Sequence, residues 1–464
     1  MGDDPGDEAS TTGAAQPAPA SPAAPTTSPA APDPAQLLRS PGYVALLLVG
    51  ALVGIPSAGV AYFFLAFVGK SQTWVFTDLP RGLGLGSPQW WPVLPLAVSG
   101  LVVGLTIRYL PGTAGHRPAE GFKAGSPVDP RDLPGITLAA LATLCLGAVL
   151  GPEAPLIAIG SGLGVLAMHL LRKDAPQQAV GVIAGAGSFA AIATLLGSPI
   201  TGAFLLMEAA GLAGPMMGVV LVPGLLAAGI GALIFVGLDS WTGLGTFSLA
   251  ITHLPSISAP TLSELLWAVA IGIVAAVLGR LVKHGALTLQ PLVERRQVTL
   301  TPVVGVLVAL TAILFEAVTD KDASFVLFSG QDALPDLVHQ ASSWSAGTLL
   351  LLLVCKGVAY MLSLSCFRGG PIFPGMFLGA VLGILVAQLP GLSMIAGVGI
   401  GIGAFTVAML GLPLVSVLLP SLLLLGDVTS LMPLIIVGVV TSYVVSARLA
   451  PAPTPTTTTA AASP

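Results

Sequence analysis

The chain has 464 residues, of which 54% are hydrophobic and only 8% are charged, and its formal net charge is −4. Because a soluble globular domain carries about 25% charged residues, this composition excludes an ordinary soluble protein and indicates an all-α polytopic membrane protein. The small net charge, without a basic cluster, gives no sign of a nucleic-acid partner. The cysteines and histidines fit no ligand spacing, so we expect no metal, no cofactor and no disulfide framework.

The chain begins with a low-complexity segment. Residues 1–38 are acidic and rich in Ala, Pro, Ser and Thr, which predicts a disordered tail without the features of a signal peptide. Apolar runs at 44–68 and 90–107 follow. The polar stretch at 108–131 carries several basic residues and is assigned to the cytoplasmic side by the positive-inside rule.

Two series of apolar segments make up the remainder. The first series lies at about 134–150, 155–171, 180–196, 199–213 and 216–237, and the second at about 264–283, 300–318, 346–364, 373–388, 394–410, 413–425 and 431–447. Several segments are shorter than the roughly 20 residues of a full crossing, which is typical of half-helices that meet near mid-membrane. A second positive loop is expected from Arg280, Lys283, Arg295 and Arg296, and residues 449–464 are predicted to be a second disordered tail.

An internal repeat organises these segments. Two spaced patterns each occur twice, in the same order. The first is Gly151-Pro152-x2-Pro155-x4-Gly160-x3-Gly164, which recurs as Gly370-Pro371-x2-Pro374-x4-Gly379-x3-Gly383. The second is Gly185-x-Gly187 followed by Leu196-Gly197-x-Pro199, which recurs as Gly399-x-Gly401 followed by Leu410-Gly411-x-Pro413. The match predicts one transmembrane domain over residues 39–448, with repeat halves at about 43–238 and 261–448. Such symmetry places a substrate site where the halves meet, and an odd number of crossings in each half would make the repeat inverted.

The repeated motif suggests anion chemistry. Proline is favoured at a helix start, so Pro155 and Pro374 are expected to begin helices, and Pro118 and Pro199 are candidates for further half-helix starts. A helix N-terminus carries about half a positive charge and binds anions. Two such N-termini facing each other would form a site for a small inorganic anion.

Glu153 is the charged residue inside this motif. A charge at the bilayer centre costs from about 2.5 to more than 10 kcal/mol, so an intramembrane carboxylate is a candidate functional group. Because the same positive field attracts an anion and a carboxylate, ionised Glu153 could occupy the anion's place and leave when protonated, as a pH-sensitive gate. The alternative is a carboxylate that only caps a helix.

Several segments resemble the CLC family of chloride channels and chloride/proton antiporters. The similar motifs are Gly151-Pro152-Glu153-Ala154-Pro155, Gly369-Gly370-Pro371-Ile372-Phe373-Pro374, Leu196-Gly197-Ser198-Pro199-Ile200-Thr201-Gly202 before Glu208, and Gly115-His116-Arg117-Pro118. The resemblance implies an inverted repeat of tilted and broken helices, usually a homodimer. It also implies a gating role for Glu153, anion binding by the amides of Ile372 and Phe373 and by Gly151 and Ala154, and an approach of Gly115 from the cytoplasmic side.

The chain also departs from the family pattern. Pro152 replaces a basic residue, and Gly115 stands where the family has a coordinating serine, so Ser198 or Thr201 would have to supply a hydroxyl. Tyr443 is the weak substitute for the family's pore tyrosine. Lys356 and Arg368 lie close to the second half-helix and could raise the local anion concentration. The alternative for Lys356, which sits at an apolar boundary, is that its long side chain only carries its charge to the membrane surface.

The predicted function is transport of a small inorganic anion, with chloride as the expected substrate. Ala209 follows Glu208 where proton-coupled members often carry a glutamate, which favours a channel, but Glu208 itself could relay protons or be structural. A chloride/proton antiporter, a scaffold without transport, and a membrane-embedded enzyme that uses Glu153 as acid/base remain alternatives; no HExxH or GxSxG motif accompanies the last. We expect the protein to resemble a voltage-gated channel and to form a homodimer. We also expect it to lie in the plasma membrane with both tails on the cytoplasmic side.

Overall fold

The computed structural model describes residues 39–86, 88–122, 124, 126–212, 216–244, 250–251, 259–424 and 428–450. The predicted tails lie outside these residues, apart from positions 449 and 450. Within the described residues the chain folds into helices and contains no β-strand. By length and composition, eight of the described helices could cross a membrane, while five apolar helices of 10–17 residues are shorter.

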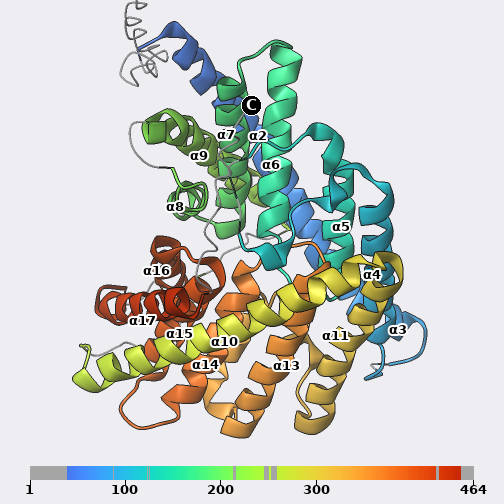
Figure 1. Cartoon of the computed structure of the whole chain (residues 1–464), viewed down its shortest axis with the longest axis vertical. Coiled ribbons are helices and arrows are strands. Elements are labelled where there is room, and N and C mark those ends of the chain that lie inside the picture. The colour runs from blue at the N-terminus through green and yellow to red at the C-terminus, as the bar shows by residue number, and fades with distance from the viewer. Residues whose placement is uncertain are drawn as a thin grey trace, which may run out of the picture.

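The helices form two consecutive series that occupy different parts of the molecule (Figure 1). The first series consists of α2 (Pro41–Thr73), α3 (Leu79–Gly82), α4 (Val93–Tyr109), α5 (Leu133–Cys145), α6 (Glu153–Leu171), α7 (Gln177–Leu196), α8 (Pro199–Ala209) and α9 (Met216–Thr242). The second consists of α10 (Leu262–Glu294), α11 (Gln297–Thr319), α12 (Ala333–His339), α13 (Ala346–Cys366), α14 (Ile372–Ala387), α15 (Met394–Leu410), α16 (Pro413–Leu423) and α17 (Val428–Leu449). Helices α4 and α11 pack against each other and join the two series.

Three details of the predicted elements were wrong. Arg280 and Lys283 lie inside α10 rather than in a loop, because this helix continues for 33 residues. Pro155 and Pro374 are the third residues of α6 and α14 rather than the first. The N–H groups of a first helical turn have no partner within the helix, so a proline fits there without loss of a hydrogen bond. Pro118 begins only a three-residue 3-10 turn, whereas Pro199 does begin α8.

The repeated glycines bring helices into backbone contact. A methyl group at Gly160 would overlap the carbonyl of Gly187, and one at Gly187 would overlap the carbonyl of Gly160. The second half repeats this arrangement with Gly379 and Gly401. Small residues allow helices in lipid to approach closely. The repeated spacing therefore encodes two equivalent helix pairs, α6 with α7 and α14 with α15.

The two halves meet where these pairs begin. The N–H of Gly151 donates to the carbonyl of Gly370 at 2.8 Å, and the N–H of Gly370 donates to the carbonyl of Gly151 at 2.6 Å. These glycines hold equivalent positions in the repeat, and their bridge is antiparallel. A reciprocal antiparallel bridge between equivalent residues relates the two halves here by a local two-fold rotation, the symmetry that an inverted repeat has when its axis lies in the membrane plane.

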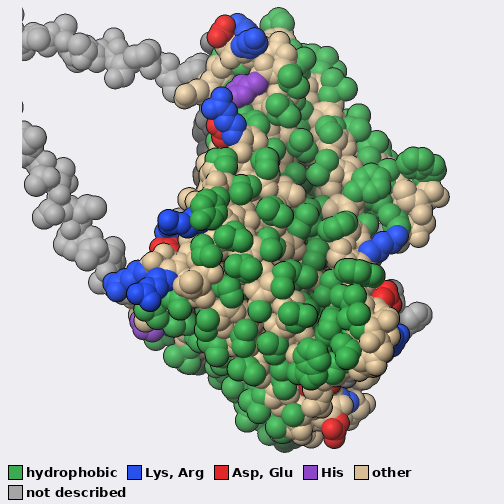
Figure 2. Space-filling model, turned by 90° about the vertical axis from the view of Figure 1, so that its right-hand side faces the viewer, with side chains coloured by type: hydrophobic (Ala, Val, Ile, Leu, Met, Phe, Trp, Pro, Cys, Tyr) green, Lys and Arg blue, Asp and Glu red, His purple; other side chains and the backbone are tan. Residues whose placement is uncertain are grey.

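The outer surface is suited to lipid. Figure 2 shows a face covered almost continuously by hydrophobic side chains, with charged side chains at its margins. Helices α2, α9, α10 and α11 each expose leucines or valines. Because lipid is the solvent for such a surface, the chain is a multi-pass membrane protein.

Candidate functional site

The side chain of Glu153 lies at the meeting point of the halves. Glu153 is the first residue of α6, and it is completely buried. Its Oε1 accepts a 2.8 Å hydrogen bond from the backbone N–H of Phe373, in the first turn of α14. The carboxylate of one half therefore occupies the positive N-terminus of the equivalent helix in the other half, where an anion would bind.

The second carboxylate oxygen of Glu153 is unusual. Oε2 is buried and has no hydrogen-bond partner within the described residues. A methyl group at Gly151 or at Gly370 would overlap this carboxylate, so the two bridging glycines provide the space that it occupies. A buried oxygen without a partner costs about 1–3 kcal/mol, and more when charged. The carboxylate is thus incompletely satisfied, although the backbone amides of Ile372 and of Glu153 itself also attract its charge.

Side chains from α13 hold the two loops that form this site. The hydroxyl of Tyr360 donates to the carbonyl of Pro371 at 2.8 Å, directly before α14. The backbone N–H of Val149 donates to the hydroxyl of Ser363 at 3.0 Å, directly before the Gly151 bridge. Sequence reasoning missed both residues, because neither belongs to a motif and the hydrogen bond to Val149 spans 214 positions of the chain.

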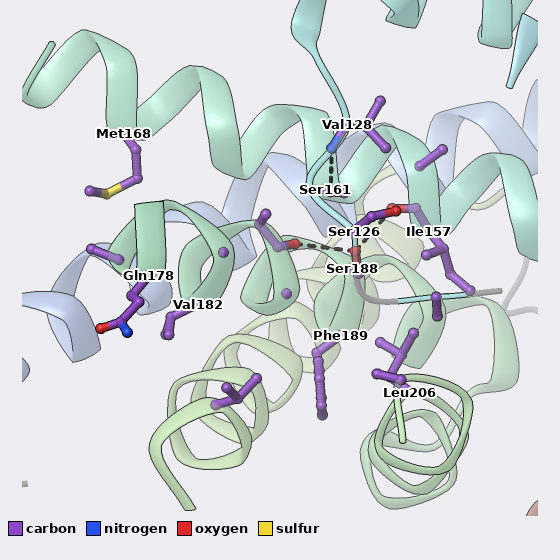
Figure 3. Close-up of a pocket in the computed structure, with 18 of the residues that line it drawn as sticks. Ser126, Val128, Ile157, Ser161, Met168, Gln178, Val182, Ser188, Phe189 and Leu206 are labelled. Atoms are coloured by element: carbon purple, nitrogen blue, oxygen red, sulfur yellow. Dashed lines mark hydrogen bonds between the residues drawn. The ribbon is translucent and has the colours of Figure 1, made fainter. Parts of the chain in front are cut away.

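A cavity of about 980 Å³ reaches the Glu153 region from the side of α7, and Gly115, Ala154 and Gly369 line its end nearest Glu153. Figure 3 shows part of its lining, where Ser161 and Ser188 lie among apolar side chains such as Ile157 and Val128. The hydroxyl of Ser161 accepts from the N–H of Val128, and that of Ser188 donates to the carbonyl of Ile157. The cavity offers a mixed apolar and hydroxyl lining to an ion that approaches Glu153.

Besides Glu153 itself, five of the predicted site residues lie around its carboxylate or along the cavity. Gly151 contacts the Glu153 carboxylate, the amide of Phe373 binds it, Ile372 is buried beside that amide, and Gly115 and Ala154 line the cavity.

Glu208 lies at another interface. Its two carboxylate oxygens accept 2.9 Å hydrogen bonds from the N–H groups of Leu414 and Val415, at the N-terminus of α16. Both oxygens are therefore engaged in capping a helix, which is the structural alternative for this residue. Its role as a proton relay stays a prediction.

The weaker pore candidates lie away from the cavity. Ser198 caps α8, because its hydroxyl oxygen accepts hydrogen bonds from both the N–H and the hydroxyl of Thr201, at 3.2 and 3.1 Å. Tyr443 lies on α17 with 43% of its surface exposed. None of the three is among the residues that line the cavity in the described part of the chain. The described residues also form no cluster of three metal-ligating side chains.

Comparison with known proteins identifies the relatives of this chain. The family model described as "Voltage gated chloride channel" matches residues 99–447. "Putative ion-transport protein YfeO" of Salmonella paratyphi A is 30% identical over 350 residues, which cover 74% of this chain and 80% of that protein. The protein of the same description from Escherichia fergusonii is 26% identical over 351 residues, which cover 74% of this chain and 79% of that protein.

Solved structures show the same fold. A slow cyanobacterial Cl−/H+ antiporter superposes with a TM-score of 0.71 at 18% identity, covering 87% of this chain and 94% of that one. A CLC-type fluoride/proton antiporter superposes with a TM-score of 0.65 at 21% identity, covering 87% and 95%. At these identities the likeness concerns the fold.

Proposed function

This chain belongs to the voltage gated chloride channel family of anion-transporting membrane proteins, and we propose that it conducts a small inorganic anion along a path gated by Glu153. Chloride is the expected substrate. Members of the family are channels and transporters rather than enzymes, so the enzyme alternative is not carried further.

One observation carries the proposal: Glu153 Oε1 binds the N–H of Phe373 at the start of α14. Ionised Glu153 and a permeant anion compete for the same positive helix N-terminus. Protonation removes the charge of Glu153 and its attraction to that N-terminus, and the anion takes its place. The sign follows directly: flux rises as the pH falls.

Proton coupling is the second candidate mode. The two structural neighbours are described as proton antiporters, and a carboxylate that moves on protonation can carry a proton. The capping role of Glu208, with both oxygens bonded to N–H groups, favours uncoupled transport. We also propose that the protein is a homodimer in the plasma membrane with both tails cytoplasmic, and that residues 39–448 form a single transport domain.

The test is reconstitution of the full chain in liposomes, with chloride efflux and external pH recorded together. Uncoupled transport gives chloride efflux without proton movement, whereas antiport gives proton movement in a fixed ratio to chloride. Repeating the assay with nitrate and fluoride ranks the anions. The absence of flux for all three anions would contradict the proposed function.

A further inference from the structure

Arg368 is a buried cation at the edge of the cavity. It lies between α13 and α14 with 5% of its surface exposed, and it lines the cavity beside Gly369. Its guanidinium donates to carbonyls of Thr113, Cys366 and Phe367 at 3.2–3.4 Å. These distances lie at or beyond the long end of the range for good N–H···O bonds, about 2.7–3.2 Å, so the guanidinium is loosely held.

Among the described residues, Arg368 forms no ion pair, and Glu120 and Glu294, which attract its charge from farther away, are themselves paired with Arg117. Carbonyl groups satisfy N–H donors but do not neutralise a cation, and a buried charge is costly unless it is paired. A mobile anion in the cavity would supply the missing charge.

Lys356 shows how the same fold treats a buried cation that serves structure. Its ammonium donates to four successive carbonyls, from Phe325 to Phe328, at 3.0–3.4 Å. The ring of Phe377 covers it at 4.4 Å, and Lys356 is not among the cavity-lining residues. Arg368 differs because it faces a space large enough for an ion.

The charged lining of the cavity has one sign. Arg172, which is exposed, and Arg368 both line it, and no Asp or Glu does so within the part of the chain that the structure describes. A cleft lined by one sign of charge concentrates the opposite ion. The two arginines therefore favour an anion over a cation in this cavity, most strongly at the buried Arg368.

The loop that meets Arg368 has an unusual backbone conformation. Gly112, Thr113, Ala114 and Gly115 all have positive φ angles, of 73°, 48°, 59° and 87°. Positive φ is rare for non-glycine residues and strained for a β-branched residue such as Thr113. In this conformation the carbonyl of Thr113 meets Arg368, while Gly115, which has no side chain, lines the cavity.

We propose that Arg368 is a specificity-determining residue, a fixed cation that binds the permeant anion at the end of the cavity nearest Glu153. The ligand class is a small monovalent inorganic anion. This inference rests on the proposed function, but its test separates the two.

The experiment compares wild-type protein with Arg368→Gln and Arg368→Lys. Chloride flux in liposomes is measured against chloride concentration, and bromide binding to the purified protein is measured by calorimetry. We expect Arg368→Gln to raise the half-saturating chloride concentration about tenfold, which corresponds to about 1.4 kcal/mol, and to abolish bromide binding at this site. Arg368→Lys should retain binding because it retains the charge, but should alter the preference between nitrate and chloride because an ammonium lacks the planar fork of donors of a guanidinium.

Arg172→Gln is the matched control, since it removes the same charge from the exposed part of the cavity lining. For this variant we expect the half-saturating chloride concentration to change by less than about twofold, because exposed charges are screened.

Unchanged half-saturation and bromide binding in Arg368→Gln would overturn the inference while leaving the proposed function intact. If wild-type protein shows no flux, the proposed function fails and bromide binding alone decides the inference. If Arg368→Gln does not fold, Arg368→Lys decides: an altered ratio of nitrate to chloride half-saturation supports the site, and an unchanged ratio overturns it.

Discussion

Two glutamates of the first half reach across to helices of the second half, and they do so differently. Glu153, at the start of α6, reaches α14, and Glu208, near the end of α8, reaches α16. In the second half, the equivalent positions are occupied by Ile372 and Leu422. Both carboxylates therefore break the symmetry of the repeat in the same direction.

The difference lies in how completely each carboxylate is satisfied. Glu208 is partly exposed and uses both oxygens on N–H groups, so it has everything that a helix cap requires. Glu153 is fully buried, uses one oxygen, and leaves the other without a partner among the described residues. A cap that is complete stabilises the fold, whereas an incomplete buried cap beside an anion path can exchange with the anion.

The largest expected effect is on flux through the Glu153→Ala variant. Removing the carboxylate leaves the N-terminus of α14 open to the anion at every pH. We expect flux near neutral pH to rise at least about tenfold, equivalent to about 1.4 kcal/mol, and its pH dependence to disappear. Chloride efflux from liposomes, recorded from about pH 5 to about pH 8, measures both. A pH dependence like that of the wild type would sink the gate assignment.

The next prediction concerns a variant that keeps the charge of Glu153 but fills the space that its carboxylate occupies. In Gly370→Ala, the new methyl group overlaps the Glu153 carboxylate and should displace it from Phe373. We expect raised flux at high pH, smaller than in Glu153→Ala because the carboxylate stays nearby. Gly375→Ala, in α14 shortly after Gly370, is the control, since its methyl group would meet Met409 at an ordinary 3.5 Å. Equal flux in the two variants would contradict the prediction.

The third prediction concerns stability instead of flux. Glu208→Ala leaves two N–H groups at the start of α16 without their acceptors, and the loss of such a cap costs about 0.5–2 kcal/mol. We expect a lower thermal unfolding midpoint in detergent and a pH dependence of flux like that of the wild type. Glu153→Ala should lose less stability, because it also removes the unpartnered buried oxygen. The reverse order of stabilities would break the distinction between the two carboxylates.

The smallest effect is expected from Tyr360→Phe. This change removes the hydrogen bond to the Pro371 carbonyl, which is worth about 0.5–1.5 kcal/mol, and loosens the backbone just before α14. We expect a modest loss of stability and a change in flux of about twofold, since less than 1 kcal/mol separates such rates. Tyr62→Phe is the control, because the hydroxyl of Tyr62 pairs with Thr242, which is not part of the Glu153 site. Equal flux changes in both variants would show that Tyr360 does not position α14.

Much of the fold could be read from local patterns. The apolar runs correspond to described helices, and the glycines of the repeat turned out to be the contact points between Gly160 and Gly187 and between Gly379 and Gly401. The ends of elements were predicted less well. Charges at Arg280 and Lys283 suggested a loop, although long side chains can carry a charge to the membrane surface from within a helix.

The sequence by itself determined that the chain is a helical membrane protein with an internal repeat and an intramembrane carboxylate. These features are local, because in lipid each helix must satisfy its own backbone hydrogen bonds and glycine spacing follows the helical period. Only the tertiary structure decided that Glu153 meets the N–H of Phe373, 220 positions away, and that Arg368 meets Thr113 across 255 positions. Such contacts depend on how the two halves are placed against each other, and no spacing along the chain encodes that placement.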